Sequence, residues 1–307
     1  MGPYPVVIHT VLGPIAANSL GRCLMHEHLI CNIFRVTGNV NHLLNDEAMA
    51  VQELQNLRST GGASLVECTT PDLGRAPDRL VRIAQASGVH VIMGTGWYTQ
   101  PYYPSTIDTS STESLAEILV TELSLGLGDS GYGPGIIGEI GTAREYATAG
   151  EERVFRAAAR AQKATGAPIT THASMFPVGI VQLSILDEEG VDLRRVIVGH
   201  ADTCLDEAYH LAVIARGATL GFDTIGRTHI NPDSQRVEAI LRLLALGHVG
   251  SIVLSSDRCH RSDLTAFGGA GYGFVFGAFF DQLRRAGVSQ SELDIMTVEN
   301  PRRLLDW

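Results

Sequence analysis

The chain has 307 residues, 45% of them hydrophobic and 18% charged, so it is long enough to bury one large core. Its 33 acidic and 23 basic residues give a formal net charge of −10, and the basic residues are scattered rather than clustered. This distribution argues against nucleic acid or an anionic membrane as a partner and leaves a small-molecule substrate as the expected one.

The N-terminus and the cysteines indicate a soluble, cytoplasmic protein. The stretch MGPYPVVIHTVLGPIAANSLG has neither a basic start nor an unbroken apolar core, so it does not resemble a signal peptide. No apolar run approaches the roughly 18 residues of a membrane-spanning helix. The five cysteines are an odd number without a CxxC pair, which favours reduced thiols over a disulfide framework.

Short apolar segments alternate with amphipathic segments along the chain. Helical periodicity is clear over residues 115–127, 151–166 and 206–217, and these stretches end at or beside a glycine that suits a C-terminal cap. The predicted strands, in chain order, are CLMHEHL (23–29), SLVECTT (64–70), VHVIMGTG (89–96), GIIGEIGT (135–142), PITTHAS (168–174), RVIVGHA (195–201), TLGFDT (219–224) and SIVLSSD (251–257).

Strand–helix units repeated in this way predict an α/β protein that is a single (β/α)8 TIM barrel domain spanning residues 1–307. The strands are nearly continuous apolar runs because both faces of such a sheet are buried. A doubly wound open sheet is the alternative. No long linker, low-complexity tract or sequence repeat divides the chain.

Histidines and carboxylates stand at the ends of the predicted strands, the face on which barrels hold their active sites. In CLMHEHL, the strand period of two places His26 and His28 on one face and Glu27 on the other. A single strand-end histidine is more often a hydrogen-bonded core residue than a metal ligand, but here several converge on one rim. The candidate ligands are His26, His28, Glu139, His172, His200 and Asp257.

These imidazole and carboxylate groups suit Zn²⁺ or another borderline divalent ion, such as Mn²⁺, Co²⁺ or Fe²⁺. The set is too large for one tetrahedral site and matches two metal ions that share a bridging carboxylate. The expected chemistry is hydrolysis by an activated hydroxide, with the scissile C=O or P=O polarised by the metal ions. Asp257 is expected to take the proton of the attacking water and to pass it to the leaving group.

Several motifs spread over nearly the whole length form a recognisable set. They are TVLGPIAANSLGRCLMHEH at the N-terminus, GIIGEIGT in the fourth strand, THAS and VGHAD in the fifth and sixth, and GGAGYGFVFGAFFDQLRRAGVSQSELDIMTVENPRRLL near the C-terminus. Together they resemble the motifs of the phosphotriesterase-related family of the amidohydrolase superfamily. In FDTIG and the glutamate of the fourth strand, the chain resembles the bacterial phosphotriesterase homology proteins.

The resemblance implies a role for each candidate ligand. His26, His28 and Asp257 would hold the more buried metal ion, and His172 and His200 the more exposed one. In phosphotriesterases and lactonases of the family a carboxylated lysine on strand four bridges the metals. The only lysine of this chain, Lys163, falls in a predicted helix, so Glu139 is expected to bridge instead.

The substrate is less defined than the metal site. Phosphotriesterases and lactonases of the family place histidine or arginine after the strand-seven aspartate, but this chain has Thr224. Arg227 is a candidate for binding a substrate carboxylate or phosphate, with pairing to a loop acid as the alternative. Trp97 and Tyr98, just after strand three, are expected to wall the pocket or to pack within the loop.

We expect hydrolysis of a carboxylic ester or lactone, although the sequence of the substrate loops does not distinguish among substrate classes. Phosphotriesters and N-acyl amides are alternatives, since the same site attacks each of these electrophiles. A hypothesis from another class is a non-catalytic metal-binding barrel, against which the intact set of ligands argues. Homodimers are common among the proteins that the chain resembles, so a homodimer is the expected assembly if the chain is not a monomer.

Overall fold

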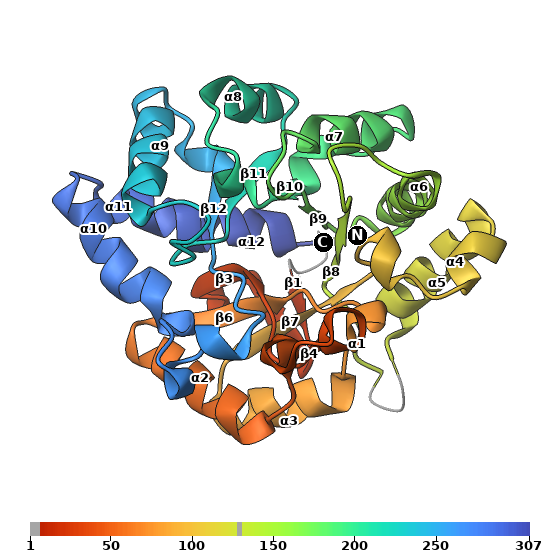
Figure 1. Cartoon of the computed structure of the whole chain (residues 1–307), viewed down its shortest axis with the longest axis horizontal. Helices are drawn as coiled ribbons and strands as arrows, with labels where there is room; N and C mark the ends of the chain where they lie inside the picture. The colour runs from red at the N-terminus through yellow and green to blue at the C-terminus, as the bar shows by residue number, and fades with distance from the viewer. Residues whose placement is uncertain (1–6, 128–130) are drawn as a thin grey trace, which may run out of the picture.

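Parallel strands form the centre of the molecule and helices surround them (Figure 1). The structure, a computed structural model, describes residues 7–127 and 131–307. The strands neighbour one another in chain order without reversal, which excludes the doubly wound sheet and confirms the predicted barrel. They are β3 (Arg22–Glu27), β6 (Gly62–Glu67), β7 (His90–Thr95), β8 (Ile136–Gly141), β9 (Ile169–His172), β10 (Val196–Gly199), β11 (Thr219–Phe222) and β12 (Ile252–Leu254).

Helices follow the strands along the chain and cover the outside of the barrel (Figure 1). Two π-helical turns, Val275–Phe279 and Ile295–Glu299, lie in the C-terminal segment. The α-helices of the barrel are α2 (Glu47–Ser59), α3 (Pro77–Ser87), α4 (Thr106–Thr109), α5 (Thr112–Leu125), α6 (Ala149–Thr165), α7 (Gly179–Glu188), α8 (Glu207–Ala215), α9 (Asp233–Ala245), α10 (Phe280–Arg285), α11 (Gln290–Asp294) and α12 (Asn300–Leu305).

The local sequence explains where the predicted helices begin and end. In α6 the side chain of Thr148 accepts from the backbone of Glu151 while Glu151 reaches back to Thr148, which forms a capping box. The helix ends at Thr165 and is capped by Gly166, whose φ of 86° is the left-handed conformation that glycine adopts readily. The side chains of Ser111 and Asp206 cap the N-termini of α5 and α8 by accepting hydrogen bonds from backbone N–H groups of the first turn.

The barrel is closed between its last and first strands by side chains as well as backbone. The hydroxyl of Ser255, after β12, donates to the carbonyl of His26 over 2.8 Å, and the Asp257 N–H donates to the same carbonyl over 3.1 Å. Glu27 faces away from the site and accepts from the backbone N–H groups of Ser256 and Arg258, each over 2.8 Å. Glu27 therefore links the two strands that close the barrel.

Two apolar clusters form the core. One fills the barrel interior with side chains from β3, β6, β7, β8, β10 and β12, such as Met25 and Ile197. The other packs the helices on the outside of the strands. Both faces of the sheet are thus buried, as the continuous apolar runs predict.

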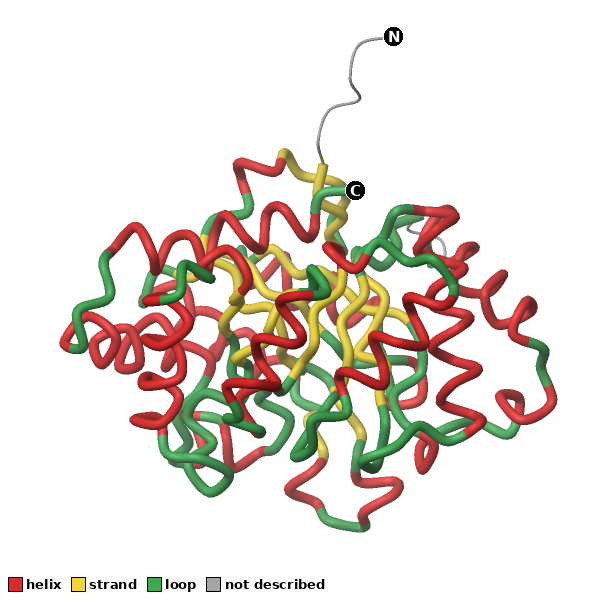
Figure 2. The backbone as a smooth tube through the Cα atoms, turned by 90° about the horizontal axis from the view of Figure 1, so that it is seen from above, coloured by secondary structure: helices red, strands yellow, loops and turns green. Residues whose placement is uncertain are grey.

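Two short hairpins lie outside the barrel sheet and were not predicted. Strands β1 (Val7–Thr10) and β2 (Gly13–Ala16) pair near the C-terminal end of the chain (Figure 2). Strands β4 (Cys31–Asn32) and β5 (Leu43–Leu44) flank α1 (Phe34–Thr37) between β3 and α2. Among the described residues, no helix has both the length and the apolar character needed to cross a bilayer.

Candidate metal centre

The structure brings all six candidate ligands together at the C-terminal ends of the strands. His26 lies in β3, Glu139 in β8 and His172 at the end of β9. The loops that follow β10 and β12 position His200 and Asp257, with φ of 54° and 46°. Left-handed conformations of non-glycine residues are uncommon and concentrate at functional sites.

Glu139 is the centre of the cluster, and its side chain is buried. Its Oε2 lies 3.3 Å from Nε2 of His26, 3.0 Å from Nδ1 of His172 and 3.5 Å from Nε2 of His200. Its Oε1 lies 3.2 Å from Nε2 of His28. One carboxylate therefore reaches histidines from both halves of the predicted ligand set.

Asp257 joins the cluster from the opposite strand. Its Oδ1 is 3.2 Å from Nε2 of His28 and 3.9 Å from Nε2 of His26. Its Oδ2 is 3.2 Å from Nη2 of Arg227. The two oxygens thus face different partners, imidazole on one side and guanidinium on the other.

The donor set fits metal ions. His26, His28 and Glu139 offer ligand atoms within 4.8 Å of one another, and so do Glu139, His172 and His200. Carboxylate oxygens lie 3.3 Å from Nε2 and 3.2 Å from Nδ1 of the buried His26, yet neither nitrogen forms a well-aligned hydrogen bond with the described residues, which is unusual for buried polar atoms unless a further ligand is present. Nitrogen and carboxylate oxygen donors in this mixture suit Zn²⁺ and related ions.

The histidines of the cluster stabilise the ionised form of two buried carboxylates. Burial opposes ionisation of Glu139, yet the charge of His26 and hydrogen bonds from His172 and His200 outweigh it, so the pKa of the Glu139 carboxyl lies well below its ordinary value. Burial also opposes ionisation of Asp223, but His200 and His26 lower its pKa to about 2. Both carboxylates are therefore negatively charged at neutral pH.

Asp223 is a site residue that the sequence reasoning missed. Its Oδ1 lies 2.7 Å from Nδ1 of His200 and accepts the His200 backbone N–H over 2.8 Å, while its Oδ2 lies 3.2 Å from Nδ1 of His26. A carboxylate on the far nitrogen of a ligand histidine fixes the ring and its tautomer. Its position at the end of TLGFDT was the available signal.

A pocket of about 270 Å³ opens over the cluster and receives two of the three predicted substrate contacts. Tyr98 and Arg227 line it, and the Tyr98 hydroxyl lies 3.3 Å from Nε2 of His172. Trp97 instead lines a different cavity of about 570 Å³. The structure therefore separates Trp97 from the pocket that it was expected to wall.

Arg227 is buried and pairs with acids, which was the alternative expected for it. Its Nη2 contacts Asp257, Asp263 at 3.3 Å and the sulfur of Cys259 at 3.0 Å. Neither Nε nor Nη1 donates a hydrogen bond to any residue that the structure describes. The guanidinium is thus anchored through one nitrogen and has donors to spare.

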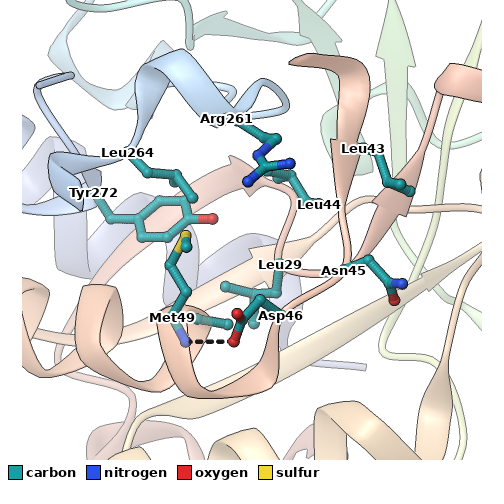
Figure 3. Close-up of a pocket in the computed structure, with 10 residues that line it drawn as sticks. Leu29, Leu43, Leu44, Asn45, Asp46, Met49, Arg261, Leu264 and Tyr272 are labelled. Carbon is teal, nitrogen blue, oxygen red and sulfur yellow. Dashed lines mark hydrogen bonds between the residues drawn. The ribbon is translucent and has the colours of Figure 1, made fainter. Parts of the chain in front are cut away.

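A separate pocket of about 260 Å³ lies between the start of α2 and the segment after β12 (Figure 3). Apolar side chains such as Leu29, Met49 and Leu264 line it, and it contains none of the six candidate ligands. Tyr272 borders this pocket and donates its hydroxyl to the carbonyl of His28 over 2.6 Å. Tyr272 therefore connects the wall of this pocket to the backbone of His28.

Fold and site together define a (β/α)8 barrel with a carboxylate-centred histidine cluster on its C-terminal face, and the chain is similar to known proteins over nearly its whole length. The model of the phosphotriesterase family matches residues 6–305. The phosphotriesterase homology protein of Escherichia coli K12 is 37% identical over 92% of this chain and 96% of its own. Its crystal structure, described as complexed with phosphate in the active site, superposes with a TM-score of 0.91 over 94% and 99% of the two chains, at 36% identity.

Two further relatives have names that state an activity. An N-acetyltaurine hydrolase of Salmo salar is 30% identical over 98% of both chains. The crystal structure of a lactonase of Listeria monocytogenes superposes with a TM-score of 0.91, at 28% identity, over 97% of this chain and 98% of its own. The chain belongs to the phosphotriesterase family, as the motifs predicted, and is a hydrolase of that family.

Proposed function

We propose that the protein is a binuclear metal-dependent hydrolase of a carboxylic ester or lactone. The observation that carries the proposal is the position of Glu139, which belongs to two groups of converging ligand atoms at once. His26, His28 and Asp257 would hold one ion, His172 and His200 the other, and Glu139 both. The lactonase relative supports the choice of substrate.

The protein side chains have distinct tasks in this chemistry. Two divalent cations, most readily Zn²⁺, would supply a more acidic water and a polarised scissile bond when bound. Asp257 would take the proton of the attacking water; its Oδ1 lies 3.2 Å from His28 in the cluster, and its Oδ2 lies 3.2 Å from Nη2 of Arg227. Arg227 thus orients the base and keeps its carboxylate charged.

The pocket supports a substrate that carries an anionic oxygen. Arg227 lines it with a guanidinium whose Nη1 is not hydrogen-bonded to the described residues, and the Tyr98 hydroxyl is a second polar group there. A guanidinium with unused donors suits carboxylate, sulfonate or phosphate oxygens. The phosphate in the active site of the Escherichia coli relative agrees with this reading.

N-acyl amides are the second candidate class of substrate, and the N-acetyltaurine hydrolase relatives favour them. The same site would attack an amide carbonyl, but an amine is a poorer leaving group and requires protonation as it departs. Asp257, having accepted a proton from water, would deliver it to that amine. Phosphotriesters are a third class that the shared chemistry allows.

A matched substrate panel tests the proposal. The metal-reconstituted protein is assayed with lactones, carboxylic esters, N-acyl amides and phosphotriesters, each in a neutral form and a form with a carboxylate or sulfonate. We expect turnover of esters or lactones, with higher kcat/KM for the anionic forms, and a loss of that preference in Arg227→Met. Full metal content without turnover of any class would instead support the non-catalytic barrel.

A further inference from the structure

A chain of buried hydrogen bonds from the second barrel strand ends on His28. Nδ1 of His28 lies 2.9 Å from the hydroxyl of Thr69, and that hydroxyl lies 2.6 Å from Oε1 of Glu67. All three residues are buried. Glu67 is the last residue of β6, and Thr69 follows two residues later.

The acceptor role of the Glu67 carboxylate determines which group donates in each hydrogen bond between Glu67, Thr69 and His28. The backbone N–H of Leu29 donates to its Oε1 over 3.0 Å, and the N–H of Thr69 donates to its Oε2 over 3.3 Å. Both oxygens therefore act as acceptors, so the Thr69 hydroxyl donates to Glu67 and its oxygen accepts from Nδ1–H of His28. Nδ1 keeps a proton in this arrangement.

The other nitrogen of His28 is then the one able to lose its proton. Nε2 faces Glu139 and Asp257, each with an oxygen at 3.2 Å. A neutral imidazole with Nδ1–H presents the Nε2 lone pair in that direction, which is the form a metal ligand needs. The opposite tautomer would point a hydrogen into the cluster.

The same elements also fix the His28 backbone. Glu67 holds the N–H of Leu29 and Tyr272 holds the carbonyl of His28, so the peptide group between these two residues is held at both its polar atoms. For His200 the equivalent task falls to Asp223, which contacts both the ring and the backbone N–H. Thr69 differs from Asp223 because it is a neutral group interposed between the ring and a carboxylate.

We propose that Thr69 and Glu67 are positioning residues that set the tautomer of His28 and pre-organise it for the metal centre. The inference rests on the proposed function, since it assigns a metal-ligand role to His28. Neither Thr69 nor Glu67 lines the pocket above the cluster. Their effect is therefore expected on metal binding rather than on substrate binding.

Three variants separate this role from simple packing. Thr69→Val removes the hydroxyl and keeps the shape, leaving both backbone bonds to Glu67 in place. Thr69→Ser restores the hydroxyl. Thr171→Val is the matched control, because Thr171 is also a fully buried threonine at a strand end, but its hydroxyl has no hydrogen-bond partner among the described residues.

The first measurement is long-range ¹H–¹⁵N NMR of histidine-labelled protein, with and without Zn²⁺. We expect a protected, downfield Nδ1–H signal for His28 that shifts upfield and exchanges at least about tenfold faster in Thr69→Val. The second is Zn²⁺ affinity, measured by competition with a chelator. It should fall by about tenfold to a hundredfold in Thr69→Val, as for other partners of ligand histidines, and stay within about twofold in Thr69→Ser and Thr171→Val.

Two results would overturn the proposal. One is an unchanged His28 signal and unchanged Zn²⁺ affinity in Thr69→Val. The other is an equal loss of affinity in Thr69→Val and Thr171→Val, which would show a general packing effect. Failure of the proposed function is distinguishable, because wild-type protein would then bind no Zn²⁺ while the His28 signal of the metal-free protein still reports the hydrogen bond to Thr69.

Discussion

Glu139→Gln is the substitution that most directly perturbs the centre of the cluster. It preserves the shape of the side chain and removes one negative charge that lies 3.0 to 3.5 Å from nitrogens of His26, His28, His172 and His200. We expect weaker retention of the metal pair and a fall in turnover of at least about a hundredfold.

The expected size of the fall in turnover follows from the distances around Glu139. The distance between Oε2 of Glu139 and Nε2 of His26 is 3.3 Å. At that distance a unit negative charge and a unit positive charge attract one another by about 5 kcal/mol at an effective dielectric constant of 20. The amide oxygen of glutamine still points toward the cluster and retains part of this interaction. A residual loss of about 2.7 kcal/mol, roughly half, already corresponds to about a hundredfold in rate.

The assay measures bound metal after reconstitution and dialysis, together with turnover of the best ester or lactone from the substrate panel. Glu53→Gln is the control, because Glu53 is an equally buried glutamate that accepts from Thr265 and lies outside the cluster. The Glu53→Gln protein should retain the same number of metal ions as the wild type. Wild-type metal content and wild-type turnover in Glu139→Gln would refute the assignment of Glu139 as the shared ligand.

Three further substitutions test individual parts of the site. Asp257→Asn should abolish most turnover, retain at least one metal ion and lose the acidic limb of the pH–rate profile; normal turnover with that limb intact would show that the proton goes elsewhere. Asp223→Asn should lower metal affinity by about tenfold or more because it releases the ring of His200, and equal affinity by chelator competition would contradict this. Glu27→Gln should lower the free energy of unfolding by about 1 to 3 kcal/mol, measured by thermal or denaturant unfolding, because the backbone N–H of Arg258 loses its acceptor. The metal content should stay at the wild-type level. A loss of metal without a loss of stability would contradict the structural role of Glu27.

The sequence was sufficient to predict the strands and the candidate ligands, for two physical reasons. Strands buried on both faces are visible as continuous apolar runs, and the ends of parallel strands meet on one face of a barrel. Glu139 and Asp257, distant in sequence, could therefore be placed together without coordinates. The structure adds distances that the sequence does not contain, such as the 3.2 Å between Asp257 and His28.

The groups that support the ligands were not predictable in the same way. Whether Trp97 or its neighbour Tyr98 faces the pocket depends on the path of the loop after β7, because adjacent residues point in different directions. Arg227 pairs with Asp263, an acid of another loop, and such pairing is fixed only by how the loops pack. Thr69 is an ordinary strand-end threonine until its contact with His28 is known.

Elemental analysis of the purified protein, after metal reconstitution and removal of free ions, tests most directly whether the centre is binuclear. We expect close to two divalent metal ions per chain, because Glu139 is shared between two groups of converging donors. A ratio of one or fewer metal ions per chain would contradict it.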